Sequence, residues 1–198
     1  DIRQFTTVWM DSLRGGESML VNTNKLIRFY DGATGLKTGS TGSAGYCLSA
    51  TAEKNGMELI AVVLKGKTSD ERFSDAKSLL NYGFSTWSLV TVTPDEVLPP
   101  VPVTLGVRGT VQPVLTSENT LLVEKTLANG LTKEVALAES VAAPVYAGDT
   151  LGQLTVRDAA GNTVAELPIL AGEDVGHVTF VQMLGRCLAR GFCMGPQS

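Results

Sequence analysis

The residues whose types and spacing could best support binding or catalysis lie between Gly35 and Tyr46. Lys37 supplies a positive charge, and Thr38 and Ser40 supply short hydroxyl arms that donate and accept hydrogen bonds. Glycines interrupt the same stretch, so a second backbone can approach closely where no Cβ stands in the way. A strand edge of this kind can bind an extended anionic substrate through its backbone, with the ammonium and hydroxyls near a carboxylate. We therefore expect Lys37 on an open strand face, beside a groove.

Lys37-Thr38-Gly39 also matches the Lys-Thr-Gly signature of the serine penicillin-recognising enzymes. The surrounding runs 20–26, 35–39 and 44–46 extend the match, and Arg72 and the run 79–84 continue it downstream. The chain resembles the low-molecular-weight penicillin-binding proteins that act as D-alanyl-D-alanine carboxypeptidases. The resemblance covers nearly the whole chain but only the back half of such an enzyme.

The resemblance implies a role for each matching residue. Lys37 would be catalytic, placing its charge beside the nucleophile's hydrogen-bond network, and it would also face the substrate's terminal carboxylate. Thr38 would hydrogen-bond that carboxylate, and Gly39 would keep the strand open to the substrate backbone. The backbone N–H of Ser40 would form half of the oxyanion hole. Arg72 matches a recurrent arginine that opens the last helix and would also bind the substrate; an ion pair on the helix face is the alternative.

The nucleophile itself is missing from the expected place. In the family, Ser-x-x-Lys and Ser-x-Asn both precede Lys-Thr-Gly, and acyl transfer needs their hydroxyls. Ser74–Lys77 and Ser117–Asn119 fit these patterns in letters, but both follow Lys37. We interpret them as chance matches and predict that this chain is catalytically silent by itself, as the C-terminal portion of a larger enzyme.

Other chemistries find little support in the sequence. His177 is the single histidine, and no partner motif lies near it. Lys65-Gly66-Lys67-Thr68 lacks the upstream glycine of a phosphate-binding loop, and we expect no metal or other cofactor. Cys47 lies in an apolar strand and is predicted to be a small buried hydrophobe. The net charge of −4 argues against a nucleic-acid partner.

The strand-like runs between turn signals predict an antiparallel meander of strands 35–41, 45–53 and 57–65, with the Lys37 strand at one side. Asn55-Gly56 is a strong hairpin signal between the last two. The third strand is apolar on both faces, which favours a central position. A helix follows, capped by Ser69 or Asp70, with an apolar face widened by Leu79. The expected class is therefore α+β.

Four segments are expected along the chain. Residues 1–87 form the C-terminal part of a penicillin-binding-protein/β-lactamase-like catalytic domain, and 88–102 form a proline-rich linker. Short β-prone runs between turns predict a small all-β sandwich over 103–175. Residues 176–198 form an amphipathic tail helix, too short to span a bilayer.

The beginning of the chain is the least regular part. Ile2, Phe5, Trp9 and Leu13 have the spacing of one helical face, although this segment could be irregular without whatever normally precedes it. The meander would lack the layer that covers it in a complete domain. We expect oligomerisation, domain swapping or disorder in residues 1–30 from the exposed apolar surface.

The resemblance implies that the parent enzyme removes the terminal D-alanine from peptidoglycan stem peptides through an acyl-serine, and that β-lactams acylate it. Its partners would include the missing N-terminal part of the catalytic domain. The tail helix would lie on the outer face of the plasma membrane; packing against the β domain or another copy is the alternative. A non-catalytic module that contacts cell-wall material or proteins is a competing function. A β-lactamase is a weaker candidate, because such enzymes usually end with the closing helix.

Overall fold

The computed structural model describes residues 2–192 and divides the chain into two compact units. The first unit comprises Asp1–Val90 together with Leu122–Ala128. The second comprises Thr91–Leu121 and Asn129–Ser198. Each unit has a hydrophobic core of its own.

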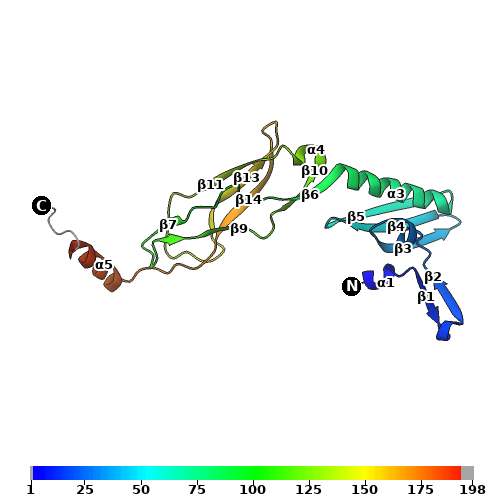
Figure 1. Ribbon diagram of the computed structural model, residues 1–198, viewed down its shortest axis with the longest axis horizontal. Helices are drawn as coiled ribbons and strands as arrows, with labels where there is room; N and C mark the ends of the chain where they lie inside the picture. The colour runs from blue at the N-terminus through cyan, green and yellow to red at the C-terminus, as the bar shows by residue number, and fades with distance from the viewer. Residues whose placement is uncertain (1, 193–198) are drawn as a thin grey trace. The chain divides into compact units, whose positions relative to one another are not determined.

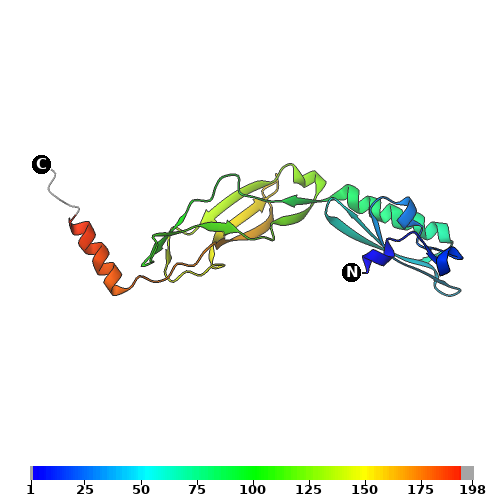
Figure 2. The same ribbon diagram turned by 60° about the horizontal axis from the view of Figure 1, so that its bottom comes forward.

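The first unit is built on the predicted meander. Strands β3 (Ala33–Thr41), β4 (Gly45–Lys54) and β5 (Met57–Gly66) form an antiparallel sheet in the order β3-β4-β5. Helix α3 (Ser69–Thr86) runs across one face of this sheet (Figures 1 and 2). Positive φ values at Asn55 and Gly56 make the tight turn between β4 and β5. The predicted hairpin and the edge position of the Lys37 strand are confirmed.

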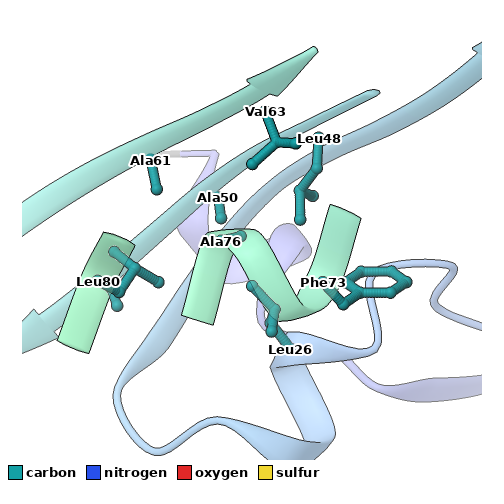
Figure 3. Packing of buried hydrophobic residues seen from close by; sticks show 9 residues of the cluster. Leu26, Leu48, Ala50, Ala61, Val63, Phe73, Ala76 and Leu80 are labelled. Atoms are coloured by element: carbon teal, nitrogen blue, oxygen red, sulfur yellow. The ribbon is translucent and has the colours of Figure 1, made fainter. Parts of the chain in front are cut away.

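The core of this unit lies between the sheet and α3 (Figure 3). Leu48 and Ala50 point inward from β4 at alternate positions, as the period of a strand requires. Phe73, Ala76 and Leu80 face them from α3 at helical spacing. The covered face of the sheet is therefore fixed by sequence periodicity, and the opposite face carries the other set of side chains.

The N-cap of helix α3 lies one residue before the predicted cap. Thr68 is the N-cap, and its hydroxyl accepts a hydrogen bond from the backbone N–H of Glu71 at 3.1 Å. The Glu71 carboxylate in turn accepts from the backbone N–H of Lys67, so that the two side chains satisfy donors at the helix start. Ser69 is the first helical residue, and the predicted cap at Ser69 or Asp70 is wrong. Leu79 is half-exposed and does not widen the buried face as expected.

The predicted central position of the third strand is also wrong. In the sheet, β4 is central and β5 has β4 as its neighbour on one side. Ile60, Val62 and Leu64 point away from α3 and are 68%, 57% and 73% exposed. An apolar run on both faces indicates burial on both faces in a complete domain. In this chain Ile60, Val62 and Leu64 lie on the face opposite α3 and are exposed to solvent.

The first residues form short elements rather than one helix. They are α1 (Arg3–Thr6), β1 (Met10–Leu13), η1 (Arg14–Gly16), β2 (Ser18–Val21) and α2 (Leu26–Phe29). Strand β1 pairs antiparallel with β2, and Gly15 and Gly16 take positive φ values in the turn between them. The expected helical face is therefore wrong, because this turn folds the chain back at the point where a helix would have continued.

Three further elements complete the first unit. Strand β6 (Trp87–Thr91) pairs with β10 (Thr120–Glu124), and the short helix α4 (Lys125–Ala128) follows β10. The Lys125 ammonium donates to the backbone oxygen of Phe84 at 2.6 Å. Residues 122–128 therefore close onto the end of α3, although they come much later in the chain.

The second unit consists of two sheets and a tail helix. The larger sheet has the order β11-β13-β14-β9, and the smaller has the order β12-β7-β8, in which β12 and β7 run parallel. The strands are β7 (Val101–Thr104), β8 (Thr110–Val111), β9 (Pro113–Leu115), β11 (Thr132–Leu137), β12 (Val141–Ala142), β13 (Thr150–Arg157) and β14 (Thr163–Ala171). Valines of β7 and β8 pack with Leu151 and Val175 in its core. The α+β class with a β-rich second part is confirmed.

Helix α5 (Phe180–Phe192) is the last described element, so the tail helix predicted over 176–198 begins four residues later than expected. Residues 193–198 of that prediction lie outside the described residues. Phe180, Val181 and Leu184 on this helix are at least half exposed. Within residues 2–192, no helix has both the length and the apolar character that crossing a bilayer requires.

Candidate substrate-binding strand

Strand β3 carries the Lys-Thr-Gly run on the edge of the sheet. It pairs with β4 on one side, with Lys37 opposite Ser49 and Thr38 opposite Leu48. Within the described sheet order, its other edge has no neighbouring strand. Backbone N–H and C=O groups along that edge can pair with an added extended chain.

Lys37 lies on the open face of the sheet. Its partner in register, Ser49, is itself opposite Val62, so that Lys37 shares a face with the exposed side chains of β5. The side chain is exposed, and its ammonium donates to the backbone oxygen of Thr38. The predicted open position of Lys37 is confirmed, while the predicted groove beside it and its catalytic role stay predictions.

Thr38 points to the opposite face and is buried. Its hydroxyl shares a 2.8 Å hydrogen bond with the hydroxyl of Thr23. The neighbouring Asn24 is also buried, donates to the backbone oxygen of Gly35 at 2.9 Å and accepts from the N–H of Leu26 at 3.1 Å. These two residues fasten the strand to the start of α2 from behind. The Thr38 hydroxyl therefore has a protein partner here, and its predicted contact with a substrate carboxylate remains untested.

Gly39 and Ser40 continue the strand beyond the lysine. A Cβ added to Gly39 would meet no atom within 4 Å, so the backbone is open at this point. Ser40 is exposed and lies opposite Tyr46 in β4. This openness is what the predicted backbone contacts of Gly39 and Ser40 require.

Arg72 lies behind the strand, in the first turn of α3. Its guanidinium donates to the backbone oxygens of Gly39 and Cys47 at 3.2 and 3.3 Å, and to the Ser69 hydroxyl at 3.3 Å. It also lies 4.8 Å from the ring centroid of Phe73. Among the described residues no carboxylate forms an ion pair with Arg72, so the alternative of a helix-face ion pair is wrong. Because Arg72 is buried, it acts on the strand through the backbone, and direct substrate contact by Arg72 stays a prediction.

The chance serine motifs do not join this strand. Ser74 and Lys77 both line a hollow of about 280 Å³ between α2 and α3, and no residue of β3 lines it. Ser117 lies in the second unit, as does His177, whose Nδ1 contacts the backbone oxygen of Val178 at 2.7 Å. Among residues 2–192, no three or more His, Cys, Asp or Glu side chains gather as metal ligands.

One feature of the site was missed from the sequence. A hollow of about 850 Å³ lies at the end of the sheet, and Ser40 is the predicted site residue that lines it. Lys65 and Lys67 also line it. The signal in the sequence is the Lys65-Gly66-Lys67 run, which places two lysines close together but lacks the upstream glycine of a phosphate-binding loop. Cys47 nearby is partly exposed, rather than buried as predicted, because it lies at the bulge where β4 leaves its register with β5.

Two family models match the chain. Residues 1–68 match the model described as D-alanyl-D-alanine carboxypeptidase, and residues 90–177 match the C-terminal domain of penicillin-binding protein 5. The chain is 33% identical to D-alanyl-D-alanine carboxypeptidase DacF of Bacillus subtilis over 94% of its length and 49% of the relative's. It is 30% identical to DacC of Escherichia coli over 71% of this chain and 36% of that protein. The chain thus spans about half or less of the curated relatives it matches.

Solved structures agree on the fold. Penicillin-binding protein 5 of Haemophilus influenzae superposes with a TM-score of 0.71 at 23% identity, over 88% of this chain and 51% of that one. The PBP3 structure from Streptococcus pneumoniae gives a TM-score of 0.59 at 24% identity, over 88% and 52%.

A Lys-Thr-Gly run on the edge strand of an antiparallel sheet, with a helix packed on that sheet, is typical of the catalytic domain of the serine penicillin-recognising proteins. The β-rich second unit, matched by its own family model, narrows the class. The chain belongs to the low-molecular-weight penicillin-binding proteins of the D-alanyl-D-alanine carboxypeptidase type.

Proposed function

We propose that the protein to which this chain belongs is a serine-type carboxypeptidase that removes the terminal D-alanine from peptidoglycan stem peptides and is acylated by β-lactams. The observation that carries this proposal is the edge of β3, which pairs with no further strand among residues 2–192 and has Lys37, Gly39 and Ser40 along it. The names of the relatives support the reaction and the substrate class.

In this proposal the chain supplies the substrate strand and one side of the site. The peptide pairs with the edge of β3, and the Lys37 ammonium supplies positive charge near its terminal carboxylate. The backbone N–H of Ser40 donates to the developing oxyanion, an interaction worth about 3 kcal/mol in enzymes of this kind. The nucleophile, its lysine and the second serine come from the part of the catalytic domain outside this chain.

The test compares this chain with the complete protein. We expect fluorescent penicillin to label the complete protein stoichiometrically and to leave the chain unlabelled, and we expect D-alanine release from a pentapeptide by the complete protein alone. A covalent adduct on the chain would refute its predicted silence. If the complete protein is neither labelled nor active, it is instead an interaction module.

The tail helix supports a peripheral place on the outer face of the plasma membrane. Phe180, Leu184 and Leu188 lie on one side of α5 with exposed fractions of 80%, 50% and 56%. Pelleting with anionic liposomes should separate the whole chain from one ending at Val175. Leu184→Asp should weaken pelleting, while Gln182→Asp adds the same charge at an exposed polar position and serves as the control. Equal pelleting of the whole and shortened chains would exclude the anchor.

The exposed face of β5 supports a further partner, the rest of the catalytic domain. Ile60, Val62 and Leu64 form an apolar row of a kind that soluble monomers usually cover. Without that cover, we expect self-association of the chain, which light scattering would detect. The double change Val62→Thr and Leu64→Thr should shift the chain toward the monomer. A wild-type chain that is monomeric at high concentration would contradict this expectation.

A further inference from the structure

The hollow of about 850 Å³ at the end of the sheet brings together residues that are distant in sequence. Ser40 and Thr41 come from β3, Tyr46 comes from the start of β4, and Lys65 and Lys67 come from the end of β5 and the loop after it. Hydroxyl groups and ammonium groups therefore face one solvent-open space. Both kinds of group donate hydrogen bonds to an anion.

The charge of this hollow is uncompensated. Lys65 and Lys67 are exposed, and within the described part of the chain neither ammonium forms an ion pair with a carboxylate. None of the residues that line the hollow is acidic. The carboxylate of Glu71 lies near Lys67 but accepts the backbone N–H of that residue at the helix start. Two positive charges are thus available to a ligand.

The backbone around the hollow is specialised. Lys65 has a φ of 59°, which is uncommon for a residue with a side chain. The pairing of β4 with β5 shifts register between Tyr46 and Leu48, and such bulges re-aim side chains beside functional sites. Gly45 also has a positive φ, and a Cβ there would lie 2.9 Å from the backbone oxygen of Gly66. The glycine lets the two chain segments meet at the base of the hollow.

We propose that this hollow is a subsite for a carboxylate carried by the acyl part of the peptide substrate. This inference rests on the proposed function, because it takes the peptide to lie along β3. With the terminal carboxylate near Lys37 and the carbonyl of the penultimate residue at the Ser40 N–H, an extended peptide continues past Ser40 toward Thr41. The hollow then meets groups on the acyl side of that carbonyl. The chemistry selected there is a side-chain or acyl carboxylate, held by Lys65, Lys67 and the hydroxyls.

Binding to the chain itself tests the subsite without any acylation. The probes are succinyl-L-Ala-D-Ala-D-Ala and butyryl-L-Ala-D-Ala-D-Ala, which differ by one carboxylate at the acyl end. Backbone amide shifts of residues 40–46 in NMR titrations give each Kd. We expect the succinyl peptide to bind roughly three- to tenfold more tightly at low salt, as two exposed ion pairs would give. Equal Kd values for the two peptides would overturn the inference.

Variants locate the effect. In Lys65→Gln/Lys67→Gln the preference for the succinyl peptide should disappear, while in Lys77→Gln, a lysine of α3 that does not line the hollow, it should remain. A preference that survives the double change would overturn the inference, and so would inorganic phosphate that binds these amides more tightly than the succinyl peptide. Both lysines are exposed, so the urea midpoint of the double variant should match the wild type.

The outcome is separable from that of the proposed function. Penicillin labelling of the complete protein reports on the serine chemistry, whereas the titration reports on ion pairing at residues 65 and 67. If labelling is absent but the lysine-dependent preference is present, the reaction is wrong and the carboxylate subsite stands. If labelling is present and the preference is absent, the subsite is wrong and the reaction stands.

Discussion

Arg72→Met tests whether the buried guanidinium holds the substrate strand against α3. The side chain is 8% exposed and donates to the backbone oxygens of Gly39 and Cys47 at 3.2 and 3.3 Å. Hydrogen bonds from a charged group are worth about 1.5–3 kcal/mol each. The donor–acceptor distances of these two are long for hydrogen bonds, so we take the lower energy for each, and their joint loss costs about 3 kcal/mol. The contact with the Phe73 ring adds about 0.5–1 kcal/mol.

An opposing contribution lowers this cost. The Nε atom of Arg72 is buried without a hydrogen-bond partner among the described residues, which costs about 1–3 kcal/mol in the native protein. Methionine removes that cost and keeps most of the apolar stem. The net expectation is a loss of about 2 kcal/mol in the free energy of unfolding of the first unit.

Urea denaturation followed by tryptophan fluorescence measures this loss. The sequence has two tryptophans, Trp9 and Trp87, and both belong to the first unit, so the signal reports on that unit. With a slope near 2 kcal/mol/M, the midpoint should fall by about 1 M. Arg72→Lys keeps the charge without the planar fork and should lie in between. Arg28→Met, at an exposed arginine, should change stability by less than about 0.5 kcal/mol.

A midpoint of Arg72→Met within about 0.25 M of the wild type would refute the reasoning, because this is well below the expected shift. It would mean that the free energy gained from the donated hydrogen bonds only offsets the cost of burying the charged guanidinium. An Arg28→Met effect of the same size as Arg72→Met would refute it differently, since the loss would then not depend on the strand contacts.

The other predictions concern Gly39 of the edge strand, Gly152 of β13 and Tyr30. In Gly39→Ala the new Cβ meets open space, so the free energy of unfolding of the chain should change by less than about 0.5 kcal/mol. Penicillin labelling of the complete protein should nevertheless slow about tenfold or more. Gly109→Ala, also in open space, is the control and should change neither the stability nor the labelling. Gly152→Ala places a Cβ 2.2 Å from the backbone oxygen of Ala136 and should destabilise the second unit by about 3 kcal/mol, a loss that circular dichroism melting would show or disprove. Burial, and then the charge of the adjacent Asp31, raise the pKa of Tyr30. The contribution of Tyr30 to stability is therefore complete below pH ~10 and is lost as pH rises through the raised pKa of the folded state. Absorbance at 295 nm should show a tyrosine that ionises late, and Tyr30→Phe should abolish that signal.

The sheet and its helix could be predicted from the sequence because their signals are local. Alternation along β4 specifies the buried face, and the Asn55-Gly56 pair specifies the turn into β5. The i, i+3, i+7 spacing of Phe73, Ala76 and Leu80 specifies the side of α3 that packs on the sheet. The lysine-bearing edge strand follows from the same pattern.

Features that depend on distant residues could not be predicted in this way. The hydrophobic run of β5 does not say which neighbour covers it, so its edge position was missed. The contacts of Arg72 with two strands depend on the tertiary fold, and a helix-face ion pair was a reasonable local alternative. The hollow combines residues 40–46 with 65–67, and no short window of sequence contains both.

The return of residues 122–128 to the first unit makes that unit discontinuous along the gene. A shortened protein that stops in the proline-rich stretch after Thr91 would contain β6 but not its pairing strand β10, and would lack the Lys125 ammonium that binds the end of α3. A recombination point in the proline-rich stretch would therefore remove residues 122–128 from the first unit. A chimaera of two relatives that keeps the first unit intact must take residues 1–90 and 122–128 from the same parent.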